Sequence, residues 1–330
     1  MTSRAGEIAK IIGTILSLIA LVFLVFSFLR LDFTSLPLPS GVLPWVVGLG
    51  LAMAYASTVG VQGLAWRATL RFLAPVKPPV ASTISVYARA NIGKYLPGNV
   101  MHFVGRNYFG ARLGLGHADM AISTAFEIMG LALAAVGLTL VGSLASGSLT
   151  LFLNSLATRR FQLILVSSTL AILTIASFAV FRISRKLRSL VIRLKERLSN
   201  AVRDVRQKKF RGGVLGFLAT LFTLYTLNFF LYAFIVVCAA YNFLGMPITF
   251  ISTISLSTAY IASWLIGFII PGAPGGLGVR EAVFLILSGS SLGHGEALAL
   301  AAISRAICFA GDGLAFLVAQ AISIPKNGKE

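Results

Sequence analysis

The sequence predicts an all-α integral membrane protein with about six transmembrane helices and two re-entrant helical hairpins in an inverted repeat. Of its 330 residues, 57% are hydrophobic and only 12% are charged, whereas a soluble domain carries about 25% charged residues. Residues 212–279 contain no Asp, Glu, Lys or Arg. Because a helix crosses the hydrocarbon core with about 20 residues, that run must hold more than one membrane element. The apolar runs are continuous rather than alternating, which argues against a membrane β-barrel.

Six apolar segments are long enough to cross the membrane as helices. They cover residues 11–29, 42–65, 120–145, 161–181, 213–243 and 297–323. No small-residue cleavage site follows the first segment, so we expect a retained span rather than a signal peptide. We expect a single transmembrane domain over residues 1–330, with one half at about residues 1–146 and the other at about residues 160–325.

Two further apolar stretches, residues 79–105 and 248–292, are interrupted by residues that break helices. Proline removes a backbone N–H and clashes with the preceding turn, and glycine adds backbone freedom. Neither stretch should therefore form one continuous helix. The predicted breaks are Pro97 and Gly98 in the first stretch, and Pro271, Pro274, Gly275, Gly276 and Gly278 in the second.

The distribution of Lys and Arg between the loops predicts how the segments are oriented, since cytoplasmic loops carry the excess of basic residues. Basic residues precede and follow the stretch 79–105, which should therefore enter and leave the membrane on the cytoplasmic side as a re-entrant hairpin. The same rule places the second hairpin on the opposite side and both chain termini in the cytoplasm. Two halves of opposite orientation with broken helices are typical of transporters.

Residues 182–211 contain 12 of the 28 Lys and Arg residues and form a predicted cytoplasmic loop. Apolar residues at spacings of three and four within this loop indicate an amphipathic helix on the inner leaflet. Because the basic residues are concentrated here, the sequence favours contact with anionic membrane lipid over binding to nucleic acid.

Eight ionisable residues lie in or beside the predicted membrane segments, where a charge is costly and usually faces a polar cavity. Five are positive and three are negative, so a cavity that collects them would suit an anionic group such as a lipid phosphate. The predicted headgroup-binding residues are Arg89, Asn91, Lys94, Arg106, Arg280 and Arg305. The residues predicted to balance charge or to couple to protons are Glu127, Glu281 and Asp312.

Structural roles are the alternative for several of these residues. Arg305 and Asp312 share a helix face, because seven residues make about two turns. They either line one cavity or tie neighbouring helices together, with Arg305 paired to Glu281. Glu127 either relays protons or forms an ion pair with Lys94 or Arg106.

Other kinds of site find little support. Gly276-x-Gly278 lacks the third glycine and the preceding strand that dinucleotide binding requires. The histidines and cysteines show no metal-ligand spacing, so we expect neither a metal nor a cofactor. Acidic residues in the membrane segments are too few and too scattered to nominate an acid–base set, and we expect a protein that is not an enzyme.

Two motifs carry a resemblance to a known family. The first is Gly93-Lys94-Tyr95-Leu96-Pro97-Gly98 with Gly105-Arg106, and the second is Pro274-Gly275-Gly276-Leu277-Gly278-Val279-Arg280-Glu281. They resemble the lysylphosphatidylglycerol synthase transmembrane region family, also called flippase-like, including the lipid-flipping half of the multiple peptide resistance factor. The resemblance implies functional roles for Lys94, Pro97, Gly98, Arg106, Gly275, Gly276, Gly278, Arg280 and Glu281.

The resemblance also implies a protein of the inner membrane that handles anionic or modified lipids. Larger relatives carry a soluble aminoacyl-transfer domain for which this chain has no room, so a synthase activity is not expected. We expect translocation of an anionic, aminoacylated or polyprenyl-phosphate-linked lipid between leaflets. Two alternatives remain open: a secondary transporter of small anions, and a non-transporting lipid-binding subunit of a partner enzyme that modifies lipids or glycans.

Overall fold

The computed structural model describes residues 41–74, 77–95, 101–147, 213–269, 274–288 and 292–322. The regular elements in these ranges are all helical, which confirms the predicted all-α class. Several predictions lie outside the described residues. They concern the spans 11–29 and 161–181, the basic segment 182–211, the two termini, and the break residues Pro97, Gly98 and Pro271.

Four long helices match predicted spans. They are α2 (Leu43–Leu73), α5 (His117–Ala145), α8 (Gly213–Leu244) and α11 (His294–Ala321). Together with α9 (Phe250–Ile269), they make five helices in the described part of the chain that are long and apolar enough to cross a membrane. The chain is therefore a multi-pass membrane protein.

Local signals in the sequence set where these helices begin and end. Pro44 lies in the first turn of α2, where its missing N–H needs no partner. Gly245 ends α8 with a φ of +64°, and its N–H donates to the carbonyl of Tyr241 at 3.1 Å. At the start of α11, the Glu296 carboxylate accepts a hydrogen bond from the Gly293 N–H at 3.1 Å.

The first interrupted stretch is divided into short helices, as predicted. It forms α3 (Val80–Asn91), the 3₁₀ turn η1 (Ile92–Tyr95) and α4 (Met101–Ala111). Helices of 12 and 11 residues are only about 18 Å long, too short for a hydrocarbon core of about 30 Å. α4 folds back along α3 and contacts it. The two helices approach closely at Gly105, where an added Cβ would lie 3.2 Å from the Cβ of Ala90.

The second interrupted stretch is divided in the same way but less evenly. It forms α9, the 3₁₀ turn η2 (Pro274–Gly276) and α10 (Val279–Ser288). α10 folds back along α9 and contacts it. These two helices approach closely at Gly267, where an added Cβ would lie 3.1 Å from the Cβ of Arg280. Unlike α3, the 20-residue α9 is long enough to cross the hydrocarbon core by itself.

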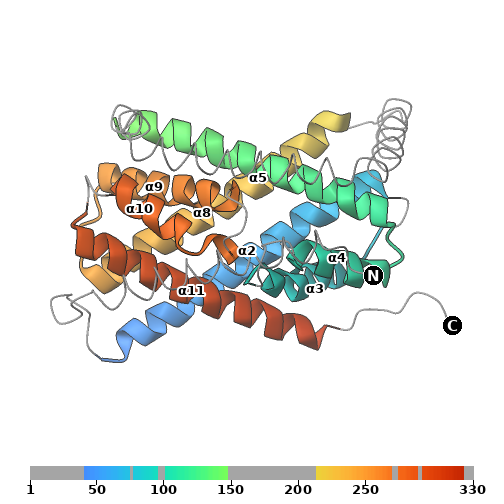
Figure 1. Ribbon diagram of the computed structural model, residues 1–330, viewed down its shortest axis with the longest axis horizontal. Helices are drawn as coiled ribbons and strands as arrows, with labels where there is room; N and C mark the ends of the chain where they lie inside the picture. The colour runs from blue at the N-terminus through green and yellow to red at the C-terminus, as the bar shows by residue number, and fades with distance from the viewer. Residues whose placement is uncertain are drawn as a thin grey trace, which may run out of the picture.

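The two helical hairpins lie toward opposite ends of the bundle, α3 and α4 at one end and α9 and α10 at the other (Figure 1). Their breaks meet, because η1 contacts η2. Between them, α2 packs against α8 and α11, while α5 and α11 lie on opposite sides of the bundle (Figure 1). Re-entry of each hairpin from one side of the membrane, and the inverted repeat, stay predictions.

Large apolar side chains cover the outside of the bundle. Leu215 is 80% exposed and Phe222 is 62% exposed on α8, and Leu133 is 72% exposed on α5. Contiguous exposure of such residues is unfavourable in water but matches acyl chains of lipid. Hydrophobicity therefore does not drive these helices together inside the bilayer, and close packing around small residues must do so.

Gly311 on α11 provides such a close approach to α2. A Cβ at this position would lie 2.6 Å from the carbonyl oxygen of Ala52 and 2.7 Å from the ring of Tyr55. Gly313, two residues further on, has no atom within 4 Å of such a Cβ. We predict that Gly311→Val separates α2 from α11 and lowers stability by about 1–3 kcal/mol, as overpacking of a tight core does.

The measurement is the melting temperature of the purified protein in detergent, with Gly313→Val as the matched control on the same helix. Gly311→Val should lower the melting temperature by several degrees and Gly313→Val should change it little. Equal effects of the two substitutions would contradict the close α2–α11 contact.

Candidate functional site

One buried carboxylate on α11 holds the break of the first hairpin. Asp312 is 1% exposed, and Lys94 Nζ lies 2.7 Å from its Oδ2. Asn91 Nδ2 donates to its Oδ1 at 2.6 Å, and the Tyr95 hydroxyl donates to its Oδ2. All three donors come from residues 91–95, where α3 gives way to η1. The carboxylate therefore compensates the break with one ion pair and two further hydrogen bonds.

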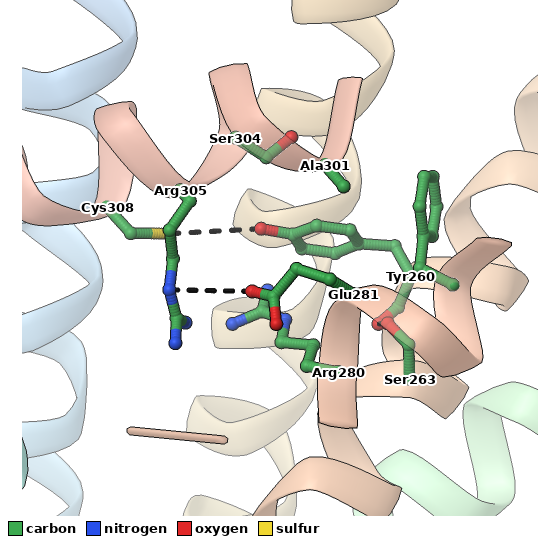
Figure 2. Close-up of a pocket in the computed structure, with 9 residues that line it drawn as sticks. Tyr260, Ser263, Arg280, Glu281, Ala301, Ser304, Arg305 and Cys308 are labelled. Atoms are coloured by element: carbon green, nitrogen blue, oxygen red, sulfur yellow. Dashed lines mark hydrogen bonds and ion pairs between the residues drawn. The ribbon is translucent and has the colours of Figure 1, made fainter. Parts of the chain in front are cut away.

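Arg305, two turns earlier on α11, holds the break of the second hairpin. Its Nη2 donates to the Gly275 carbonyl at 2.9 Å, and its Nε lies 3.5 Å from Glu281 Oε1 (Figure 2). The other oxygen of Glu281 accepts a hydrogen bond from the Gly278 N–H at 2.7 Å, which caps the start of α10. One helix thus anchors both breaks with side chains of opposite charge.

Glycines give the second break its shape. Gly275 and Gly276 have φ of +56° and +73°, a left-handed conformation that residues with a Cβ rarely adopt. A Cβ on Gly276 would also lie 3.2 Å from the Gly267 carbonyl oxygen, and one on Gly275 would lie 3.5 Å from the Tyr95 ring. The backbone of the second break can therefore pack directly against the first.

A third buried ion pair joins Arg106 on α4 to Glu127 on α5. The Arg106 guanidinium lies 4.7 Å from the centre of the Tyr87 ring and 4.9 Å from that of Phe103, contacts that favour a desolvated cation. The Tyr87 hydroxyl donates to Glu127 Oε1 at 2.8 Å. Of the ion pair, Glu127 faces the cavity described next, while Arg106 lies behind it.

A cavity with about 730 Å³ of empty space, part of it open to the outside, lies between the two breaks. Three cations and one carboxylate line it: Lys94, Arg280, Arg305 and Glu127. Its walls also include aromatic side chains from five helices and one turn, namely Tyr55, Tyr87, Tyr95, Phe103, Tyr232, Trp264 and Phe268. A smaller pocket of about 240 Å³, lined by residues of α9, α10 and α11, adjoins it at Arg280 and Arg305 (Figure 2).

Arg280 is the cation of this cluster that lacks a carboxylate. It is 8% exposed, lies in the first turn of α10, and its guanidinium sits 4.3 Å from the centre of the Tyr260 ring. No carboxylate of the described residues lies within ion-pair distance, and its Nη2 has no hydrogen-bond partner there. With the paired residues behind the walls included, the cluster has four cations and three carboxylates: Lys94, Arg106, Arg280 and Arg305, and Glu127, Glu281 and Asp312. It therefore keeps one positive charge, which suits an anion.

Arg89 lies away from this cluster. Its Nη2 donates to the carbonyls of Ala319 at 2.8 Å and Ile322 at 2.7 Å, at the end of α11. Carbonyls in a last helical turn have no helical partner and carry partial negative charge, so a cation there is stabilising. The structure thus gives Arg89 a helix-capping contact, whereas its predicted binding role would need a headgroup at that end of the bundle.

The structure brings most predicted site residues to one place. Asn91, Lys94, Glu127, Gly275, Gly276, Arg280 and Arg305 line the large cavity, and Glu281 lines the smaller pocket. Arg106 and Asp312 lie directly behind, paired with lining residues. The two structural pairings weighed from the sequence, Arg305 with Glu281 and Glu127 with Arg106, are both present.

Apart from Asn91, the aromatic and neutral polar residues of the cavity were not predicted from the sequence. Gln62 Nε2 donates to Asn228 Oδ1 at 3.0 Å, and the Tyr87 hydroxyl lies 2.8 Å from Gln62 Oε1. These residues form a polar seam between α2, α3 and α8. A tyrosine within a long apolar helix carries no sequence signal of its position. The isolated Gln62 in an otherwise apolar span was the one usable hint.

Comparison with known proteins agrees with the motifs. A family model, described as the lysylphosphatidylglycerol synthase TM region, matches residues 10–315. The match includes both breaks and all three buried ion pairs. No curated protein matches the chain.

The Lys94–Asp312 pair leads to a prediction about stability. Replacing Asp312 by Asn leaves Lys94 without a counter-charge and weakens the acceptor for Asn91 and Tyr95, so stability should fall by about 3–5 kcal/mol. Lys94→Gln should cost less, because the Asp312 carboxylate keeps two donors. The double variant should be more stable than the sum of the single losses predicts.

Melting temperatures in detergent measure this cycle, with Glu296→Gln at the start of α11 as a control for removing a carboxylate from the same helix. If the two single losses are equal and additive, Lys94 and Asp312 do not act as a pair.

Proposed function

This chain belongs to the lysylphosphatidylglycerol synthase transmembrane region family, and we propose that it is a flippase-like protein. It moves an anionic, aminoacylated or polyprenyl-phosphate-linked lipid between the leaflets of the inner membrane. The observation that carries the proposal is the net-positive cavity at the meeting point of two helix breaks. An isolated headgroup charge is expensive in hydrocarbon, and compensating charge along its route lowers that cost.

The walls of the cavity suit an amphiphile. Lys94, Arg280 and Arg305 would compensate the phosphate, with arginine able to donate two parallel hydrogen bonds to its oxygens. Aromatic rings between these cations exclude water while tolerating apolar parts of the lipid. The acyl chains remain outside, along apolar helix faces such as that of Leu215 and Phe222.

The contacts that hold the breaks can also be exchanged. A phosphate that reaches Lys94 competes with Asp312, and one that reaches Arg305 competes with Glu281, whose 3.5 Å separation from Arg305 is too long for a good hydrogen bond. Release of either anchor would free a break whose glycines accept several backbone conformations. Glu127, Glu281 and Asp312 would balance charge or take up protons during this exchange.

Orientation follows from the charges of the loops. We propose that both termini face the cytoplasm and that residues 182–211 lie on the anionic cytoplasmic surface of the inner membrane. The proposal assigns no covalent chemistry to the chain. A partner enzyme that modifies lipids or glycans would act before or after translocation.

A lipid-flip assay in reconstituted vesicles tests the proposal. Wild-type protein should move fluorescent phosphatidylglycerol between leaflets, and Arg280→Gln should slow this at least tenfold, because the cavity loses its uncompensated cation. Lys94→Gln should slow it less, since it removes a cation that Asp312 already neutralises. The matched control is Arg112→Gln, an exposed arginine in contact with Tyr108, which should leave the rate unchanged.

Other outcomes separate the alternatives. Movement of a soluble anion without lipid would indicate a small-anion transporter. Lipid binding by folded protein without any movement would indicate a non-transporting subunit. Equal rates for Arg280→Gln and Arg112→Gln would contradict a role for the cavity.

A further inference from the structure

The hydrogen-bond partners in the cavity distinguish donors from acceptors. Three carboxylates either line the cavity or pair with a cation that lines it, namely Glu127, Glu281 and Asp312. Each of their six oxygens lies within 3.5 Å of a donor atom. Arg280 Nη2, in contrast, is buried and has no partner among the described residues. The site therefore has a spare charged donor, whereas each of these three carboxylates is already paired with a cation.

Several aromatic rings of the site already lie against other rings or against cations of the protein. The Tyr55 ring stacks on Tyr232 with centres 5.6 Å apart, and Trp264 stacks on Phe268 at 4.9 Å. The cations of the protein itself take up other faces, with Lys94 Nζ 5.6 Å from the Tyr55 centre and Arg280 over Tyr260. An ammonium group entering the cavity would compete with Lys94 for the Tyr55 ring and would be repelled by it.

We propose that the cavity selects a phosphate-bearing headgroup of net negative charge and rejects one that also carries ammonium groups. This rests on the proposed function and narrows its three lipid classes, because it removes the aminoacylated one. The charge of the described cluster is the reason: four cations and three carboxylates leave one positive charge, at Arg280. A phosphate diester neutralises this charge, whereas a lysyl ester of the same lipid adds two positive charges to a site whose described carboxylates each already pair with a cation.

Arg280 is placed for this selection in three respects. It lies in the first turn of α10, where the helix dipole adds positive potential. It lines both the large cavity and the smaller pocket, so an anion that enters the large cavity can reach it. Its burial keeps bulk water from screening the charge, which strengthens discrimination between headgroups.

The test measures binding of four short-chain probes to purified full-length protein in detergent. They are dioctanoyl phosphatidylglycerol, phosphatidylcholine and lysylphosphatidylglycerol, and soluble glycerol 3-phosphate. Wild type should bind phosphatidylglycerol at least tenfold more tightly than phosphatidylcholine, and should bind lysylphosphatidylglycerol most weakly. Arg280→Gln should reduce this preference below about threefold, while Arg280→Lys, which retains the charge, should retain most of it.

Arg112→Gln is the matched control and should bind all probes as wild type does. A melting-temperature measurement on each variant without probe shows that it is folded. Lysylphosphatidylglycerol binding as tightly as phosphatidylglycerol, or a charge preference that Arg280→Gln leaves intact, would overturn the inference.

The flip assay on the same preparations separates this inference from the proposed function. If lipid is flipped but lysylated and unlysylated forms move equally, translocation stands and charge selection fails. If phosphatidylglycerol binds with the expected preference but no lipid moves, charge selection stands and translocation fails. Glycerol 3-phosphate binding as tightly as the lipid would support the anion selectivity and identify a soluble phosphate as its source.

Discussion

The constraint on which this structure depends is that broken helices inside a membrane must satisfy their polar groups without water. α11 meets that requirement for both breaks with two side chains on one face. Asp312 receives three donors from the first break, and Arg305 contacts Gly275 and Glu281 of the second. Opposite charges on one helix therefore bring together two segments that are far apart in the sequence.

The position and charge of the cavity follow from this arrangement. Because the breaks meet, the short helices leave space between them that continuous helices would fill. The ion pairs use up Lys94, Arg106 and Arg305, and Arg280 remains as the uncompensated cation. A buried charge without a partner lowers the stability of the fold. An anionic ligand would supply the missing partner of Arg280.

In the proposed function, lipid movement would depend on contacts that also stabilise the fold. The same Lys94–Asp312 and Arg305–Glu281 contacts that fix the breaks are those that a phosphate would contest. Close helix packing at Gly311 supports α11 independently of these charges. A framework of tightly packed apolar helices can thus stay intact while the charged breaks rearrange.

Hydropathy and helix-breaking residues alone predict the membrane class, four spans that the structure describes, the two interrupted stretches and the set of ionisable residues. Hydropathy, proline and glycine act within a few turns of the chain, so these features can be predicted locally. Helix packing determines which charges meet, since Lys94 pairs with Asp312, 218 positions away, rather than with Glu127. It also placed Arg89 at the end of α11 and surrounded the cavity with tyrosines. Such partners depend on how helices pack in three dimensions, and composition does not encode that packing.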